Sequence, residues 1–219
     1  VKLATEIIVS EFTGNPSPVP ALKDKKYSHY GVKEAVFPFN MFPEVDPLLG
    51  PEMRSTGEVL GLSENFGEAF YKAQEATQTR LPLEGTVLFS VNSSSKKELP
   101  EVAKDFHECG FKLVATGNTY EVIKEAGIPV EKINKMQEGR PNIVDGIMNG
   151  DINLVINTPA GANKQFDDSY VRKTSIKKKI PYITTMAAAK ATAAGIKAVK
   201  EHGTLNVKSL QELHAAITE

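Results

Sequence analysis

The sequence places hydroxyl and amide side chains directly after a short apolar run, in the stretch Thr116-Gly117-Asn118-Thr119. Residues 111–115 have the composition of a buried strand, and residues 120–126 have the pattern of a helix. The first N–H groups of a helix lack partners within it, and the helix dipole favours negative charge there. The threonine hydroxyls add donors, and the glycine lets a ligand approach the backbone. The stretch predicts an anion site; the alternative is a plain turn in which Asn118 or Thr119 only caps the helix.

Similar side chains follow the other predicted strands, at residues 86–91, 130–133, 152–156 and 181–185. Parallel strands bring their carboxyl ends to one edge of a sheet, so these side chains are expected to converge. Hydroxyls, amides and lysines together suit the binding of a phosphate. The candidate residues for binding a phosphate or nucleotide are Ser90, Lys96, Thr116, Gly117, Asn118, Thr119, Lys135, Asn157 and Thr158.

Strands alternate with helices from residue 86 onward, which predicts an α/β fold: a three-layer, Rossmann-like open parallel sheet flanked by helices. Helices are expected over 99–106, 119–126, 142–148, 168–179, 186–200 and 210–217.

The part before residue 80 is less regular. An apolar helical stub at 1–9 suggests a piece of something longer, and a proline-rich linker follows at 14–20. A strand region is expected at 27–40, a turn-rich stretch without a periodic core face at 41–61, and a helix at 66–77 that begins near Ser63 and Asn65. The predicted organisation is a first region over 1–79, a linker over 80–85 and a second domain over 86–219.

The composition excludes several classes of function. With 26 basic and 27 acidic side chains, the net charge of −1 offers no basic field for nucleic acid or an anionic membrane. Cys109 is the single cysteine, no apolar run is long enough to span a membrane, and the first residues do not resemble a signal peptide. The four histidines are scattered, so no metal site and no catalytic residue are expected. The cytoplasm is the expected location.

Two stretches carry a resemblance to a known family. Residues 33–59, with Phe37-Pro38-Phe39-Asn40 and the Pro/Gly-rich run from Phe42 to Val59, resemble the end of the second ATP-grasp half of the carbamoyl-phosphate synthase large chain. Residues 86–219 resemble the methylglyoxal-synthase-like regulatory domain that follows it, through the motifs at 115–119, 134–141 and 154–158.

The resemblance implies an enzyme that makes carbamoyl phosphate with ATP and Mg or Mn, in pyrimidine and arginine biosynthesis. Its partners would be the rest of the large chain, a small glutaminase subunit and further copies of itself. The present part is expected to be inactive alone and to bind a nucleotide effector, UMP or IMP, at the residues given above. Ornithine would bind Glu34, Tyr182 and Thr184. Pro159 and residues 160–163 depart from the family's pattern of a hydroxyl and arginines.

Two alternatives stay open. One is a methylglyoxal-synthase-like lyase acting on a triose phosphate, which needs a carboxylate base beside the phosphate. The family's Gly-Gly-Asp motif has no counterpart here, since Arg140 occupies that turn, and Asp145 is expected to be a solvated or capping acid. The other alternative is a passive anion-binding interaction domain.

Overall fold

The computed structural model describes residues 2–19, 27–37, 57–78, 80–158, 165–203, 205 and 207–217, without the side chains of 165–167. The chain divides into two compact units, one of residues 29–206 and one of residues 1–28 with 207–219. The second unit contains helices α1 (Lys2–Thr13) and α8 (Leu210–Ala215), and both were expected. Helix α8 begins with a capping box, in which Ser209 accepts from the N–H of Glu212 and the Glu212 carboxylate accepts from Ser209.

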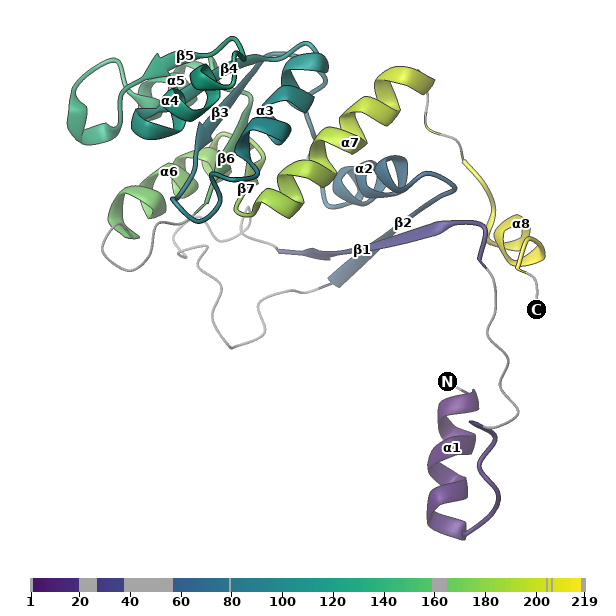
Figure 1. Cartoon of the computed structure of the whole chain (residues 1–219). Helices are drawn as coiled ribbons and strands as arrows, with labels where there is room; N and C mark the ends of the chain where they lie inside the picture. The colour runs from purple at the N-terminus through teal and green to yellow at the C-terminus, as the bar shows by residue number, and fades with distance from the viewer. Residues whose placement is uncertain are drawn as a thin grey trace. The chain divides into compact units, whose positions relative to one another are not determined.

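A five-stranded parallel sheet forms the centre of the unit 29–206 (Figure 1). Its spatial order is β5-β4-β3-β6-β7, with β3 at Thr86–Ser90, β4 at Lys112–Thr116, β5 at Glu131–Ile133, β6 at Leu154–Asn157 and β7 at Tyr182–Ile183. The helices between and after these strands are α3 (Leu99–Glu108), α4 (Gly117–Glu125), η3 (Met136–Glu138, a 3₁₀ turn), α5 (Ile143–Asn149), α6 (Gln165–Lys177) and α7 (Met186–His202). The predicted parallel α/β sheet is confirmed.

The sheet is covered on both faces because its strands carry apolar side chains on both sides. Val87 and Phe89 of β3 belong to a core with residues of α3, α4 and α7. Leu88, between them, points to the other face and belongs to a second core with residues of α5 and α6. The two cores make the three layers.

The chain builds the sheet outward in opposite directions from β3 and from β6, which are neighbours at its centre. From β3 the chain continues to β4 and β5 on one side, and it then returns to β6 and β7 on the other side. The loops after β3 and β6 therefore leave a crevice between them at the carboxyl edge, which is where ligands bind in open parallel sheets.

A second, two-stranded sheet lies outside the parallel one. Strand β1 (Tyr30–Val36) pairs antiparallel with β2 (Gly57–Ser63), and helix α2 (Phe66–Ala76) packs on them. Strand β1 lies within the predicted strand region, but 57–61 was expected to be irregular, so that prediction is wrong for β2. Gly61 made the segment look irregular, because glycine is unfavourable inside a strand. Glycine is required at this position, since a Cβ on residue 61 would collide with the carbonyl oxygen of Ala69 in α2.

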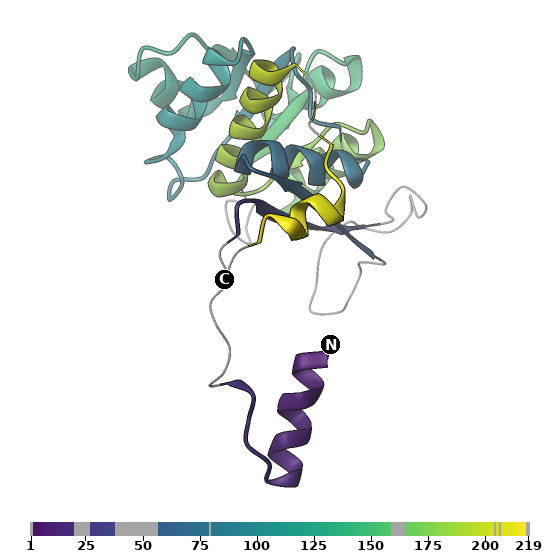
Figure 2. The same cartoon turned by 90° about the vertical axis from the view of Figure 1, so that its right-hand side faces the viewer.

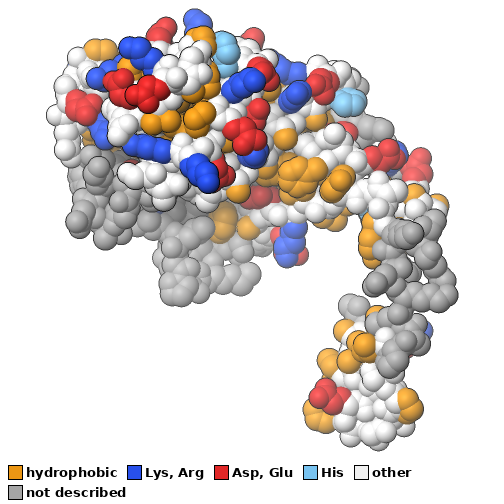
Figure 3. Space-filling model, in the orientation of Figure 1, with side chains coloured by type: hydrophobic (Ala, Val, Ile, Leu, Met, Phe, Trp, Pro, Cys, Tyr) orange, Lys and Arg blue, Asp and Glu red, His pale blue; other side chains and the backbone are white. Residues whose placement is uncertain are grey.

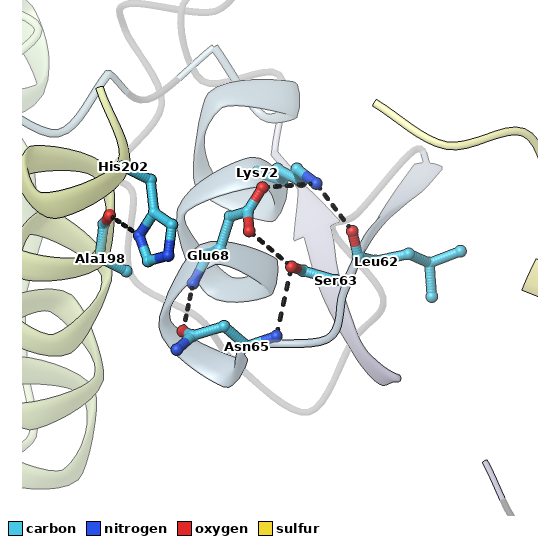
Figure 4. A network of polar contacts seen from close by, with 7 residues as sticks. All are labelled: Leu62, Ser63, Asn65, Glu68, Lys72, Ala198 and His202. Carbon is cyan, nitrogen blue, oxygen red and sulfur yellow. Dashed lines mark hydrogen bonds and ion pairs between the residues drawn. The ribbon is translucent and has the colours of Figure 1, made fainter. Parts of the chain in front are cut away.

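The corner between β2 and α2 is held by a buried polar cluster (Figure 4). Ser63 Oγ donates to Glu68 Oε2 at 2.7 Å, and Glu68 Oε1 lies 2.9 Å from Lys72 Nζ. Lys72 Nζ also donates to the carbonyl oxygen of Leu62 at 3.0 Å. Asn65 is the N-cap of α2 and accepts from the N–H of Glu68 at 3.1 Å, which confirms the expected helix start.

Helices α2 and α7 lie side by side in both views (Figure 1, Figure 2). They approach closely at small residues, since a Cβ on Gly67 would lie 2.5 Å from the carbonyl oxygen of Ala194. On the α7 side, a Cβ on Gly195 would lie 3.1 Å from the carbonyl oxygen of Gly67. The predicted boundary at 80–85 lies inside the compact unit 29–206 and stays a prediction.

Basic and acidic side chains lie next to one another on the face shown in Figure 3. Ion pairs elsewhere in the described residues include Lys190–Glu101 at 2.6 Å and Lys104–Glu108 at 3.7 Å. Within the described ranges, no helix combines the length and the apolar character needed to cross a bilayer.

Candidate functional site

A cavity of about 650 Å³ lies at the carboxyl edge of the parallel sheet, where β3, β4 and β6 end. Eight of the nine predicted phosphate-binding residues line it: Ser90, Lys96, Thr116, Asn118, Thr119, Lys135, Asn157 and Thr158. The ninth, Gly117, is adjacent, because a Cβ placed on it would lie 3.9 Å from Lys135 Nζ. The structure thus brings the predicted residues together, while their role in binding stays a prediction.

The loop after β3 forms one wall of the cavity, and two threonines hold it. Thr119 Oγ1 accepts from the N–H of Val91 at 3.1 Å and lies 3.3 Å from its carbonyl oxygen. Thr158 Oγ1 accepts from the N–H of Asn92 at 2.8 Å. The Asn92 side chain in turn accepts from the N–H of Ser95 at 2.9 Å. Both threonines therefore shape the wall, and Thr119, only 4% exposed, has its hydroxyl engaged there.

The start of α4 forms another wall. Thr116 occupies the N-cap position without a side-chain bond to the helix, and its Oγ1 donates to Ser90 Oγ at 3.3 Å. The plain-turn alternative, with Asn118 or Thr119 as the cap, is wrong about the cap residue. Gly117 has a left-handed φ of 43°, which glycine adopts without the strain that a Cβ causes. The first N–H groups of α4 have no partner within the helix.

Lys96 and Lys135 bring positive charge to this edge. Among the described residues, neither ammonium group forms a salt bridge, whereas Arg140 lies 2.9 Å from Asp145 and is mostly exposed. The backbone N–H of Asn142 donates to Asp145 at 3.0 Å, as expected of a capping acid. Arg140 therefore lies on the exposed surface next to α5, and the positive charge at the cavity comes from the two lysines.

Asn157 lies at the back of the cavity with its amide group held on two sides. Its Nδ2 donates to Asp168 Oδ1 at 3.1 Å and to the hydroxyl of Tyr182 at 2.6 Å. Asp168, on α6, is a carboxylate lining the cavity that the sequence alone did not single out.

Sequence reasoning also missed several uncharged wall residues: Leu88, Val91, Asn92, Ser93, Ser94, Met136, Ile143 and Val171. Those of the loop after β3 could have been found by the strand-end rule used for the others. The apolar ones, from both sheet and helices, give the cavity a mixed lining suited to a ligand that has polar and apolar parts.

The three residues expected to bind ornithine lie elsewhere on the unit. Glu34 is on β1 opposite Val59, and burial raises the pKa of its carboxyl. Tyr182 is on β7, and burial, the largest influence, raises the pKa of its phenol. Thr184 follows β7 and is exposed. None of the three lines the cavity. Pro159 and residues 160–163 lie outside the described residues.

Within the described residues, no group of three or more His, Cys, Asp or Glu side chains is placed to hold a metal ion. The arrangement at the carboxyl edge can recognise an anion by hydrogen bonds and by lysine charge.

Comparison with known proteins gives consistent matches. Residues 98–184 match the family model of the MGS-like domain. The carbamoyl phosphate synthase large chain, C-terminal section, of Aquifex aeolicus is 47% identical over 196 residues, which is 88% of this chain and 36% of that protein. The carbamoyl phosphate synthase large chain of Acidobacterium capsulatum is 50% identical over 188 residues, covering 86% of this chain and 17% of that one.

A further relative, the carbamoyl phosphate synthase large chain of Methanosarcina barkeri, is 38% identical over 218 residues, or 100% of this chain and 54% of that protein. The chain therefore spans between 17% and 54% of the length of these three relatives. The resemblance drawn from the sequence motifs is confirmed.

Proposed function

We propose that this chain is the regulatory end of a carbamoyl phosphate synthase large chain. Residues 98–184 match the family model of the MGS-like domain, and most of the chain is similar to the C-terminal part of such large chains. In this proposal the cavity binds the phosphate of a nucleoside monophosphate, UMP or IMP. Binding would modulate ATP-dependent synthesis of carbamoyl phosphate for pyrimidines and arginine.

One observation carries the proposal: Lys96 and Lys135 reach the same cavity as the start of α4, and neither forms a salt bridge among the described residues. A lysine without an internal carboxylate partner stays available to an anion from solution. The hydroxyls around it and the first backbone N–H groups of α4 can hold the phosphate oxygens in a fixed orientation. The volume of about 650 Å³ is within the range of small-molecule sites and leaves space for a nucleoside beside the phosphate.

Regulation then follows from unequal binding to two states of the whole protein. An effector shifts such an equilibrium only by the difference between its affinities for the two states. The chain would carry that difference from the cavity through α7 and α2 to β1 and β2. The whole protein would use ATP with Mg or Mn, and its partners would be a small glutaminase subunit and further copies of the large chain, in the cytoplasm.

Ornithine is a second proposed ligand of the whole protein, at Glu34, Tyr182 and Thr184. The raised pKa of the Glu34 carboxyl indicates a half-buried acid, which an ammonium group would stabilise in its charged form. The hydroxyl of Tyr182 already accepts from Asn157, so ornithine would meet other atoms of that residue.

Calorimetric titration of UMP and IMP into the 219-residue chain tests the nucleotide proposal. We expect binding below millimolar, and we expect Lys135→Met to weaken it by about 10–100-fold, because the loss of a charged hydrogen bond to phosphate costs about 1.5–3 kcal/mol. Lys132→Met is the matched control, since it removes the same charge from an exposed residue of β5 outside the cavity. Equal losses of nucleotide affinity in the two variants, or no binding to the wild-type chain below millimolar, would refute the proposed nucleotide site.

One observation favours the lyase alternative. Asp168 places a carboxylate in the cavity, as a base acting beside a bound phosphate would require. Its Oδ1 accepts from Asn157, which also fits a purely structural role. Incubation with dihydroxyacetone phosphate and an assay for methylglyoxal separates the two functions. Product that disappears in Asp168→Asn would establish the lyase, whereas nucleotide binding without product favours the regulatory function.

A further inference from the structure

We propose that Tyr182 is a positioning residue for the cavity: its hydroxyl, together with Asp168, fixes the Asn157 amide and links the cavity to β7. This inference rests on the proposed function for its ligand. It assigns Tyr182 a role separate from the proposed contact with ornithine, because Tyr182 itself does not line the cavity.

The strand register explains how Tyr182 reaches Asn157. Tyr182 pairs with Val155 on the neighbouring strand β6, two residues before Asn157. Residues two apart on a strand point to the same face, so Val155, Asn157 and Tyr182 share the side covered by α5 and α6. From this position the Tyr182 ring extends along the strands toward the carboxyl edge, and its hydroxyl lies 2.6 Å from Asn157 Nδ2.

The Tyr182 ring is itself held in place by α6. The guanidinium carbon of Arg172 lies 5.9 Å from the ring centroid, a distance typical of a cation–π contact. One helical turn earlier, Asp168 accepts the second bond from Asn157 Nδ2. Helix α6 thus supports both partners of the same amide group.

The two hydrogen bonds of the Asn157 NH₂ group limit what this side chain can offer to a ligand. An asparagine NH₂ group has two hydrogens, and both are used, one by Asp168 and one by Tyr182. Within the described part of the chain, no donor bonds to Asn157 Oδ1. The side chain is 3% exposed and lines the cavity, so the group it can offer to a ligand is an acceptor.

Tyr182 and Asp168 therefore determine that the oxygen of the Asn157 amide, and not its NH₂ group, is available to a ligand in the cavity. With both in place, Asn157 suits a hydroxyl or N–H of the ligand, such as those of a nucleoside, and not an unprotonated phosphate oxygen. A change in the position of β7 would move the Tyr182 hydroxyl and release the amide. Because β7 leads directly into α7, which packs on α2, the bond lies on the path from the cavity to the β1–β2 sheet.

The first test needs no nucleotide. In ¹⁵N-labelled 219-residue chain, the side-chain NH₂ signals of Asn157, assigned by their loss in Asn157→Ala, report the two bonds. We expect Tyr182→Phe to shift these signals and speed their exchange with water. Tyr170→Phe is the matched control, since Tyr170 is an exposed residue of α6 outside the cavity. Unchanged Asn157 signals in Tyr182→Phe would overturn the inference.

The second test measures UMP and IMP affinity in Tyr182→Phe, Asn157→Ala and the double variant. Loss of one positioning bond should weaken binding about five- to tenfold in Tyr182→Phe. If Tyr182 acts through Asn157, the double variant should bind no more weakly than Asn157→Ala alone. Additive losses, or unchanged affinity in Tyr182→Phe, would overturn the positioning role while leaving the nucleotide site intact. Failure of the wild-type chain to bind either nucleotide would refute the proposed function, and the NH₂ signals would still decide the role of Tyr182.

Discussion

The corner between β2 and α2 and the cavity at the carboxyl edge both contain polar side chains removed from solvent, but their bonding differs. At the corner, Glu68 and Lys72 are 11% and 18% exposed, and they bond to each other and to Ser63 and Leu62 (Figure 4). At the cavity, Lys96 and Lys135 form no salt bridge within the described residues.

Under the proposed function, this difference separates polar groups that stabilise the fold from polar groups that bind a ligand. A buried charge with its partner in place contributes to a unique structure, and removing one partner leaves the other uncompensated. A lysine that lines a cavity can remain hydrated until an anion replaces its water. Changes at the corner should therefore alter stability, and changes at the cavity should alter affinity.

The largest effect is expected from Glu68→Ala, which removes a buried carboxylate that lies 2.9 Å from the ammonium group of the half-buried Lys72 and accepts from Ser63. We expect a loss of about 3 kcal/mol in the free energy of unfolding, measured by urea denaturation. The affinity of the folded chain for UMP should stay within about twofold of wild type, because the corner does not line the cavity.

The exposed pair Lys190–Glu101 supplies the control for this prediction. Its atoms approach even more closely, at 2.6 Å, but the side chains are 49% and 61% exposed. Glu101→Ala should cost less than about 1 kcal/mol. Equal losses in the two variants would mean that burial does not distinguish the corner.

A smaller, mixed effect is expected from Gly117→Ala, at the start of α4. The φ of 43° strains an alanine, which should cost about 1–2 kcal/mol of stability. The new Cβ would lie next to Lys135, 3.8 Å from its Cε, where it would obstruct the approach of a phosphate to the backbone, so nucleotide affinity should also fall, by about three- to tenfold. Gly127→Ala, with a φ of 73° and no atom within 4 Å of the added Cβ, should lose stability alone. Loss of nucleotide affinity in both variants would mean that backbone strain anywhere in the domain weakens binding, and not the added Cβ at residue 117.

The smallest effect concerns Glu34, a half-buried acid outside both regions. Burial raises the pKa of its carboxyl in the folded chain, so the folded state binds the proton more tightly than the unfolded state. The stability gained is full below the unfolded pKa, near about 4.3, and is lost as pH rises through the folded pKa. Glu34→Gln should therefore raise the melting temperature at pH 7 by at most about 2 °C, with no difference below about pH 4.

Glu131→Gln, on the exposed edge strand β5, is the control for this change of charge. It removes a negative charge without relieving burial, so its melting temperature should follow wild type at both pH values. A fall in the melting temperature of Glu34→Gln at pH 7 would show that the Glu34 carboxylate has a stabilising partner.

The parallel sheet and most of the cavity could be predicted from the sequence, because both follow from the alternation of strands and helices. Apolar runs that alternate with helices place their carboxyl ends at one edge, so Ser90, Thr116 and Asn157 could be grouped from their positions after strands. Asp168 could not be found in this way. It lies in a helix, and only the packing of α6 on the sheet brings it to Asn157.

Strand β2 and the hydrogen bond between Thr119 and Val91 were not predicted, for a related reason. Glycines obscure the strand pattern of 57–63, and their use depends on the helix that packs on them. Thr119 resembles a ligand-binding hydroxyl in the sequence, but its bond to Val91 comes from a loop 28 residues away. Partners distant in sequence decide whether a hydroxyl is engaged or available.

The close approach of Gly67 to Ala194 and Gly195 has a consequence for protein engineering. Exchange of regulatory domains between related chains depends on cutting where few contacts are severed. A junction at 80–85 would separate α2 from α7 and pair two helix surfaces whose glycines and alanines were not matched to each other. A graft that carries residues 29–206 together would keep this helix pair intact, and with it the proposed route between the cavity and the recipient protein.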